Sequence, residues 1–144
     1  MSKVGTPNGD DYPAAAGKNL QDAQALLAAN RYDGAAYHAG YVVECALKTI
    51  VLLELGNARK WGHELNRLSL EALRLASLSG ARTARYVPKM AVGHRLYDRT
   101  SGWTESLRYR APLAVLPPDS KDWVAEAKAV YESTVVRMLL DGVI

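Results

Sequence analysis

One stretch of the sequence, residues 31–56, constrains the fold more than any other. It reads RYDGAAYHAGYVVECALKTIVLLELG, and its apolar or small positions recur every three or four residues from Ala36 to Leu53. That spacing is the period of a helix with a buried face. We expect Asp33 to cap this helix and Gly56 to end it. The stretch therefore predicts one long helix around which the rest of the chain packs.

Small residues form a seam on the predicted helix. Ala35, Ala36, Ala39 and Gly40 are close enough in sequence to share one side of it. Because their side chains are short, we expect another helix backbone to approach there.

Three further helices are predicted on either side of the long one. The first follows Asp10 or Asp11 as its cap, and a leucine-rich one follows the WGHEL turn. The leucines of the latter are spaced too irregularly for one stripe, which predicts a helix between neighbours. The last helix follows Asp119 or Ser120 and reaches Gly142. Residues 81–100 are helix-like, and we expect Pro88 to divide them into two pieces.

The fold class follows from these helices. No alternating strand pattern and no internal repeat occurs in the sequence. We therefore predict an all-α, up-and-down bundle of four to five helices. Residues 1–10 have no apolar period and are expected to form a flexible N-terminal tail, followed by a single domain over residues 11–144.

Composition and short motifs exclude several classes of protein. No run of 18 uncharged apolar residues and no leader pattern occurs, so we expect a cytoplasmic protein with no membrane contact. The lone Cys45 lies in an apolar stretch and predicts a buried, inert thiol. GHELN begins like a zinc-protease helix, but Arg67 stands where the second histidine belongs. We therefore predict no metal site, and the absence of glycine-rich phosphate loops predicts no cofactor.

Positive charge gathers late in the chain. Residues 82–110 carry a local charge of +5, whereas the whole chain carries +3. Arginine forks onto phosphate and aromatic rings stack on bases, so this segment is a candidate surface for nucleotide or RNA. The alternative is that Trp103 and Tyr109 are core aromatics and that Arg108 pairs with a buried acid such as Glu44. The candidate binding residues are Arg85, Lys89, Arg95, Trp103, Arg108, Tyr109 and Arg110.

Several elements match a known family together. An aromatic and small-residue start at Arg31–Tyr37 leads to Glu44 and Lys48, and His63-Glu64-Leu65 opens the next helix. This order resembles the HEPN family (higher eukaryotes and prokaryotes nucleotide-binding) over about residues 14–78. The resemblance implies a bundle of four or five helices, often a homodimer, found in toxin–antitoxin pairs, defence systems and RNA processing. It also implies a minimal nucleotidyltransferase as a plausible partner.

The resemblance extends to catalysis only in part. The resemblance implies that many members are metal-independent ribonucleases whose site is an arginine, four to six intervening residues and then a histidine, late in the chain. Here that spacing occurs only from Arg31 to His38, at the start of the long helix, and Arg108 is followed by no histidine. We therefore predict no catalytic site; if the chain is a ribonuclease, the candidate catalytic residues are His38 and His94. Glu44 and Lys48 are expected to form an ion pair within one helix, and with His63 they are interpreted as structural.

Three hypotheses follow. The leading one is a non-catalytic HEPN-like protein that binds nucleotide, RNA or a protein partner. The second is a metal-independent ribonuclease toxin, with His94 or His38 carrying the proton and Arg85, Arg108 or Arg110 at the phosphate. The third is a purely structural assembly module.

Overall fold

The computed structural model describes residues 4–58, 61–88, 95–98 and 102–144. Its long elements are helices α1 (Tyr12–Ala28), α2 (Tyr32–Leu55), α3 (Leu65–Ala76) and α4 (Pro117–Tyr131). The last is prolonged by a π-helical turn, η4 (Glu132–Val136), and by α5 (Arg137–Leu140). Two short 3-10 turns are η2 (Arg95–Tyr97) and η3 (Glu105–Tyr109). The described ranges hold no strand, and the prediction of an all-α fold with four to five helices is confirmed.

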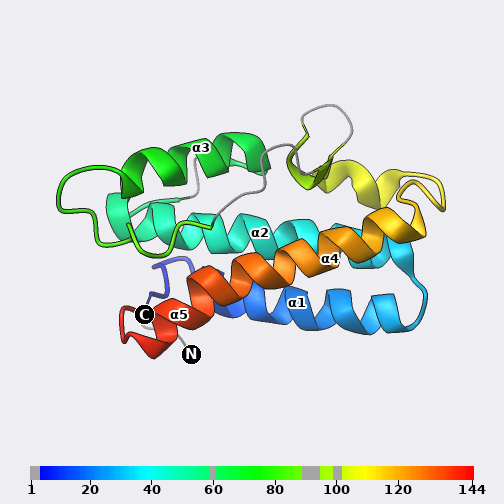
Figure 1. The fold of residues 1–144 in the computed structure, drawn as a ribbon, viewed down its shortest axis with the longest axis horizontal. Coiled ribbons are helices and arrows are strands. Elements are labelled where there is room, and N and C mark those ends of the chain that lie inside the picture. The colour runs from blue at the N-terminus through cyan, green and yellow to red at the C-terminus, as the bar shows by residue number, and fades with distance from the viewer. Residues whose placement is uncertain (1–3, 59–60, 89–94, 99–101) are drawn as a thin grey trace.

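Helix α2 is the centre of the core. It lies between α3 on one side and α1 and α4 on the other, and it contacts all three (Figure 1). Every residue from Val42 to Val51 is buried. α2 is long and apolar enough to cross a membrane by length and composition alone, yet 72% of its apolar window is buried inside the protein. A helix that is apolar all round is typical of a core that neighbours cover on every side.

The connections after α2 bring the chain back along it. α1 and α2 form an antiparallel pair, in which Asn19 meets His38 and Tyr12 meets Lys48. His63, just before α3, bonds to Glu44, which lies about 16 Å of helix before the end of α2. α3 therefore begins beside the middle of α2 and runs in the same direction. α4 also begins beside the start of α2, because Ser120 Oγ donates to the carbonyl of Tyr32 at 2.7 Å.

Helix boundaries confirm some predicted caps and correct others. The Asp11 carboxylate accepts from the amide of Ala14 and caps α1, and Gly56 ends α2 with a φ of 74°. The predicted cap Asp33 instead lies in the first turn of α2. α4 begins at Pro117, before Asp119 and Ser120, because proline suits the first helical turn, where no amide partner is needed.

α3 also differs from its prediction. It was expected between neighbours, but it is a surface helix with one buried face. Leu68 and Leu75 are buried, whereas Leu70 and Leu73 are 62% and 53% exposed. The leucine spacing is irregular because leucines lie on both the buried and the exposed face of α3. The spacing alone does not show which leucines pack against the bundle.

The expected α-helical pieces in residues 81–100 are absent from the described part of that segment, which holds only the short 3-10 turn η2. Residues 81–88 form turns, because their bonds run to other elements. Glu54 accepts from both the amide and the hydroxyl of Thr83 at 2.8 Å, and the Tyr86 hydroxyl donates to Asp141 at 2.6 Å. These bonds tie the turn to the ends of α2 and α5.

Candidate functional site

A buried ionic cluster lies at the middle of α2. The Glu44 side chain is 5% exposed, and its Oε1 accepts from Lys48 Nζ at 2.8 Å. Its Oε2 accepts from His63 Nδ1 at 2.9 Å. Both oxygens of the carboxylate are thus used, which buried charge requires. Glu44 and Lys48 lie four residues apart, as the ion pair expected from the sequence requires, and His63 ties the loop before α3 to the same carboxylate.

A group of aromatic side chains lies next to the ionic cluster, on the side toward the start of α2. The rings of Tyr37 and Tyr41 are nearly perpendicular, with centroids 5.1 Å apart. Tyr41 also meets the rings of Trp103 at 5.0 Å and His63 at 6.1 Å. Burial raises the pKa of Tyr41 above its ordinary value, and the hydrogen bond with Tyr37 adds to the shift. Tyr41 is therefore a neutral phenol that joins the ionic cluster to the segment around Trp103.

Trp103 fills the small-residue seam of α2. Its indole Nε1 donates to the carbonyl of Tyr37 at 2.9 Å, and the side chain is buried. A Cβ added to Gly40 would stand 2.0 Å from the indole. At Gly40 the seam thus admits an indole ring where a helix backbone was expected. The side chain is only 4% exposed, which leaves too little of the ring accessible for a base to stack on it.

A cavity of about 440 Å³ lies between the α1–α2 turn and η3, and we call it the η3 cavity. Arg31, Arg108 and Arg110 line it, and all three are exposed. Nη1 of Arg108 lies 3.5 Å from the Tyr37 hydroxyl, and this hydrogen bond raises the pKa of the guanidinium above its ordinary value. The other lining residues are Leu26, Asn30, Tyr32, Asp33, Gly34, Tyr37, Leu107, Pro112 and Leu113.

Asp33 is the one acid among the described residues that line the η3 cavity. Its Oδ2 accepts from the amide of Leu113 at 2.6 Å, and its Oδ1 accepts from the amide of Val115 at 2.8 Å. The carboxylate is thus directed at the backbone of the loop after η3. The three arginines outnumber this carboxylate, so the described lining of the cavity carries a net charge of +2.

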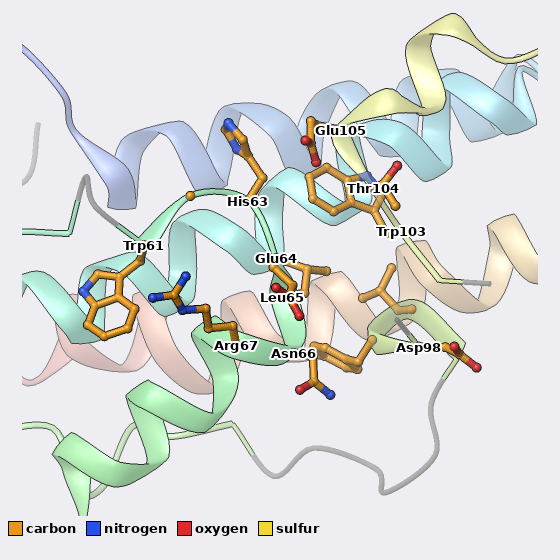
Figure 2. A pocket seen from close by; sticks show the side chains of 13 residues that line it. Trp61, His63, Glu64, Leu65, Asn66, Arg67, Asp98, Trp103, Thr104 and Glu105 are labelled. Atoms are coloured by element: carbon orange, nitrogen blue, oxygen red, sulfur yellow. The ribbon is translucent and has the colours of Figure 1, made fainter. Parts of the chain in front are cut away.

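A second cavity, of about 410 Å³, lies beside the ionic cluster, and we call it the His63 cavity (Figure 2). On one side of the cavity, the Arg67 guanidinium lies over the ring of Trp61, 5.2 Å from its centroid. Glu105 and Asp98 lie on the other side in Figure 2. Acidic and basic groups are mixed here, so this cavity gives no preference for an anion. Its lining residues are Trp61, Gly62, His63, Glu64, Leu65, Asn66, Arg67, Leu96, Tyr97, Asp98, Trp103, Thr104 and Glu105.

The structure brings only part of the predicted basic segment together. Arg108, Tyr109 and Arg110 meet at η3, where the Arg108 guanidinium lies 4.8 Å from the exposed ring of Tyr109. Arg85 lies 3.7 Å from Asp141, in the turn that is tied to the end of α2. On α2, η3 bonds to Tyr37 and the turn that holds Arg85 bonds to Glu54. These two residues are about 25 Å apart along the helix.

The remaining candidates have different placements. Lys89 and His94 lie outside the described residues, and Arg95 belongs to η2. His38 Nδ1 bonds to Asn19 Oδ1 at 2.9 Å and lies 4.0 Å from Asp22. Arg108 was weighed as a partner of Glu44, but the bonds of that carboxylate go to Lys48 and His63.

Sequence reasoning missed Arg31 as a residue that lines the η3 cavity. It lies 77 positions before Arg108, so only the packing of η3 against the start of α2 brings the two together. Among the described residues, no group of three histidine, cysteine, aspartate or glutamate side chains is placed to hold a metal ion.

Comparison with known proteins gives one match. Residues 11–135 match the family model described as HEPN domain. No curated protein and no solved structure matches the chain. The matched range includes α1, α2, α3 and α4, and with them the Glu44, Lys48 and His63 cluster. The chain therefore belongs to the HEPN domain family.

Proposed function

We propose that this chain is a non-catalytic HEPN-domain protein that binds RNA or a nucleotide at the η3 cavity. One observation carries the proposal: three guanidinium groups surround a single cavity whose one described acid bonds to backbone amides. Guanidinium groups recognise phosphate by paired hydrogen bonds and by charge. A cavity of this composition suits a phosphate-bearing ligand.

The surroundings of the arginines suit the rest of a nucleotide. Tyr109 is 78% exposed next to Arg108, so its ring is open to a base. A base stacks on an aromatic face with little regard to its sequence. Leu107, Pro112 and Leu113 add an apolar wall to the cavity. We therefore expect binding to single-stranded RNA with little sequence preference.

The positions of the histidines support the non-catalytic part of the proposal. The imidazoles of His38 and His63 bond through Nδ1 to Asn19 and Glu44, and neither lines the η3 cavity. A general acid or base must lie within hydrogen-bond reach of the proton it moves. The competing ribonuclease would therefore require His94, or a substrate that reaches His38 from outside the cavity.

The test is titration of a fluorescently labelled single-stranded RNA with the protein, followed by anisotropy over a series of salt concentrations. Arg108→Ala with Arg110→Ala should weaken binding about tenfold or more and reduce the salt dependence of affinity. Arg82→Ala with Arg85→Ala is the matched control, because it removes the same charge at the other end of α2. Equal losses in the two variants would contradict the η3 cavity as the site.

The same samples test catalysis. Incubation with RNA in the presence of a chelator should leave the RNA intact at every protein concentration. RNA products that disappear in His94→Ala or His38→Ala would establish the ribonuclease instead.

A second candidate function is binding of a protein partner. Leu70 and Leu73 are 62% and 53% exposed on α3, and exposed apolar side chains that lie together are typical of interaction surfaces. Family membership supports a homodimer, or a complex with a minimal nucleotidyltransferase. Either would act in the cytoplasm, in a toxin–antitoxin or defence system. In both cases residues 11–144 would act as one domain. Light scattering should give twice the chain mass, and Leu70→Glu with Leu73→Glu should reduce it to that of a monomer.

A further inference from the structure

We propose that Asp33 is a positioning residue of the η3 cavity, which holds the loop after η3 in its ligand-binding position. This inference rests on the function proposed above. Asp33 touches no ligand in this scheme. It acts through the backbone amides of Leu113 and Val115, and Leu113 lines the same cavity as Arg108 and Arg110.

The Asp33 carboxylate links the start of α2 to a loop about eighty residues later in the sequence. Its two oxygens accept from two amides two residues apart, Leu113 at 2.6 Å and Val115 at 2.8 Å. Asp33 lies in the first turn of α2, which is buried in the core from Val42 to Val51. Hydrogen bonds to an ionised acceptor are about twice as strong as neutral ones. A rigid helix thus fixes the loop through one side chain.

Few other contacts hold this loop. Arg108 to Ala114 are all exposed, and burial resumes only at Val115. Leu113 has a φ of 64°, a conformation that residues other than glycine seldom adopt. The bond from its amide to Asp33 is well placed to maintain that conformation. Without this bond, we expect the loop and the guanidinium groups beside it to sample several positions, and ordering them again would weaken ligand binding.

The charge of Asp33 gives the inference a sharp test. A negative group beside an anion site opposes anion binding by its charge alone. If Asp33 had no positioning role, Asp33→Asn would therefore bind RNA more tightly, or as tightly where salt screens the charge. The positioning role predicts the opposite sign, because the amide side chain offers only one acceptor oxygen for two backbone amides.

The first measurement is RNA anisotropy with wild type, Asp33→Asn, Asp33→Glu and Asp122→Asn. Asp122 is exposed on α4 and gives the same change in net charge. Binding by Asp33→Asn should be about fivefold to tenfold weaker, whereas Asp33→Glu should recover part of the affinity and Asp122→Asn should bind slightly more tightly. Equal or tighter binding by Asp33→Asn, with wild type binding normally, would overturn the inference.

The second measurement needs no ligand. Trypsin cleaves after arginine, and Arg108 and Arg110 precede the clamped loop. Limited digestion should cut Asp33→Asn faster at these two sites, while Arg82 and Arg85 are cut as in wild type. An unchanged rate at Arg108 and Arg110 would overturn the positioning role. Wild type that binds no RNA, but whose digestion responds to Asp33→Asn, would instead contradict the function proposed for the cavity.

Circular dichroism and thermal unfolding keep these outcomes separate from misfolding. Asp33→Asn should retain the helical spectrum of wild type, because the bonds of the α2 backbone do not involve this side chain. If the variant has lost helix, the comparison rests on Asp33→Glu, which keeps the charge and both acceptor oxygens. An Asp33→Glu protein that is folded but binds no better than the double variant Arg108→Ala with Arg110→Ala would overturn the inference.

Discussion

The indole of Trp103 occupies the space that any side chain at position 40 would need. A Cβ on Gly40 would lie 2.0–2.1 Å from three atoms of the ring, which is well inside van der Waals contact. The indole also bonds to the Tyr37 carbonyl, one turn earlier on α2. Gly40 is therefore required by the segment from 102 to 110, which is remote in sequence but reaches α2 through this ring.

The first prediction concerns that contact. Gly40→Ala should displace the indole and lower the free energy of unfolding by about 1–3 kcal/mol, although alanine is the better helix former. Urea denaturation followed by tryptophan fluorescence measures this change. Gly34→Ala is the matched control in the same helix, because its Cβ meets only the flexible end of Leu26, at 3.2 Å. If both variants are as stable as wild type, Trp103 does not pack as described.

The second prediction concerns the buried ionic cluster. Glu44→Leu leaves the buried Lys48 ammonium without its partner, and this should lower the free energy of unfolding by about 3–5 kcal/mol. Replacing both residues, Glu44→Leu with Lys48→Met, should restore most of the loss, because two apolar side chains of similar volume need no partner. Urea denaturation of wild type and the two variants checks this. A single variant as stable as wild type would mean that solvent reaches Lys48.

The third prediction concerns Cys45. Burial raises the pKa of its thiol to about 12, with a further contribution from the nearby Glu44 carboxylate. The thiolate is the reactive form, so the native protein at pH 8 should react with a disulfide reagent at least a hundredfold more slowly than the protein in urea. The shift stabilises the fold fully below pH 9, the ordinary value, and this contribution is lost as pH rises toward 12.

A control separates the thiol from other alkaline effects. Cys45→Ala has no thiol to ionise, so its urea midpoint should fall less between pH 9 and 11 than that of wild type. Rapid native labelling at pH 8, or identical pH profiles for the two proteins, would contradict the predicted burial of Cys45.

Much of the fold was predictable because it depends on local signals. The period of residues 31–56, the cap at Asp11 and the end at Gly56 are set by side chains close in sequence. The predictions were wrong where a hydrogen-bond partner remote in sequence determines the local structure. Asp33 was expected to cap α2, but two amides about eighty residues later bind its carboxylate. Residues 81–88 form turns because Glu54 and Asp141 bind them.

The candidate site was predictable in the same uneven way. Glu44 and Lys48 share one helix, so their four-residue spacing shows the pair. The basic residues of 82–110 form one segment in sequence, but the turn at 83–86 lies near the end of α2 and η3 near its start. Arg31 joins Arg108 only through packing, and no spacing in a single sequence indicates it.

This separation along α2 gives the last prediction, a comparison of two tyrosines. Tyr86→Phe removes the hydroxyl that donates to Asp141 and should lower the free energy of unfolding by about 1 kcal/mol, with RNA affinity unchanged. Tyr37→Phe removes the hydroxyl next to Arg108, at 3.5 Å, and should change stability little but weaken RNA binding about twofold to threefold. Urea denaturation and anisotropy on the same preparations measure both effects. If Tyr86→Phe weakens RNA binding and Tyr37→Phe does not, the ligand binds at the far end of α2, and the η3 cavity is not the site.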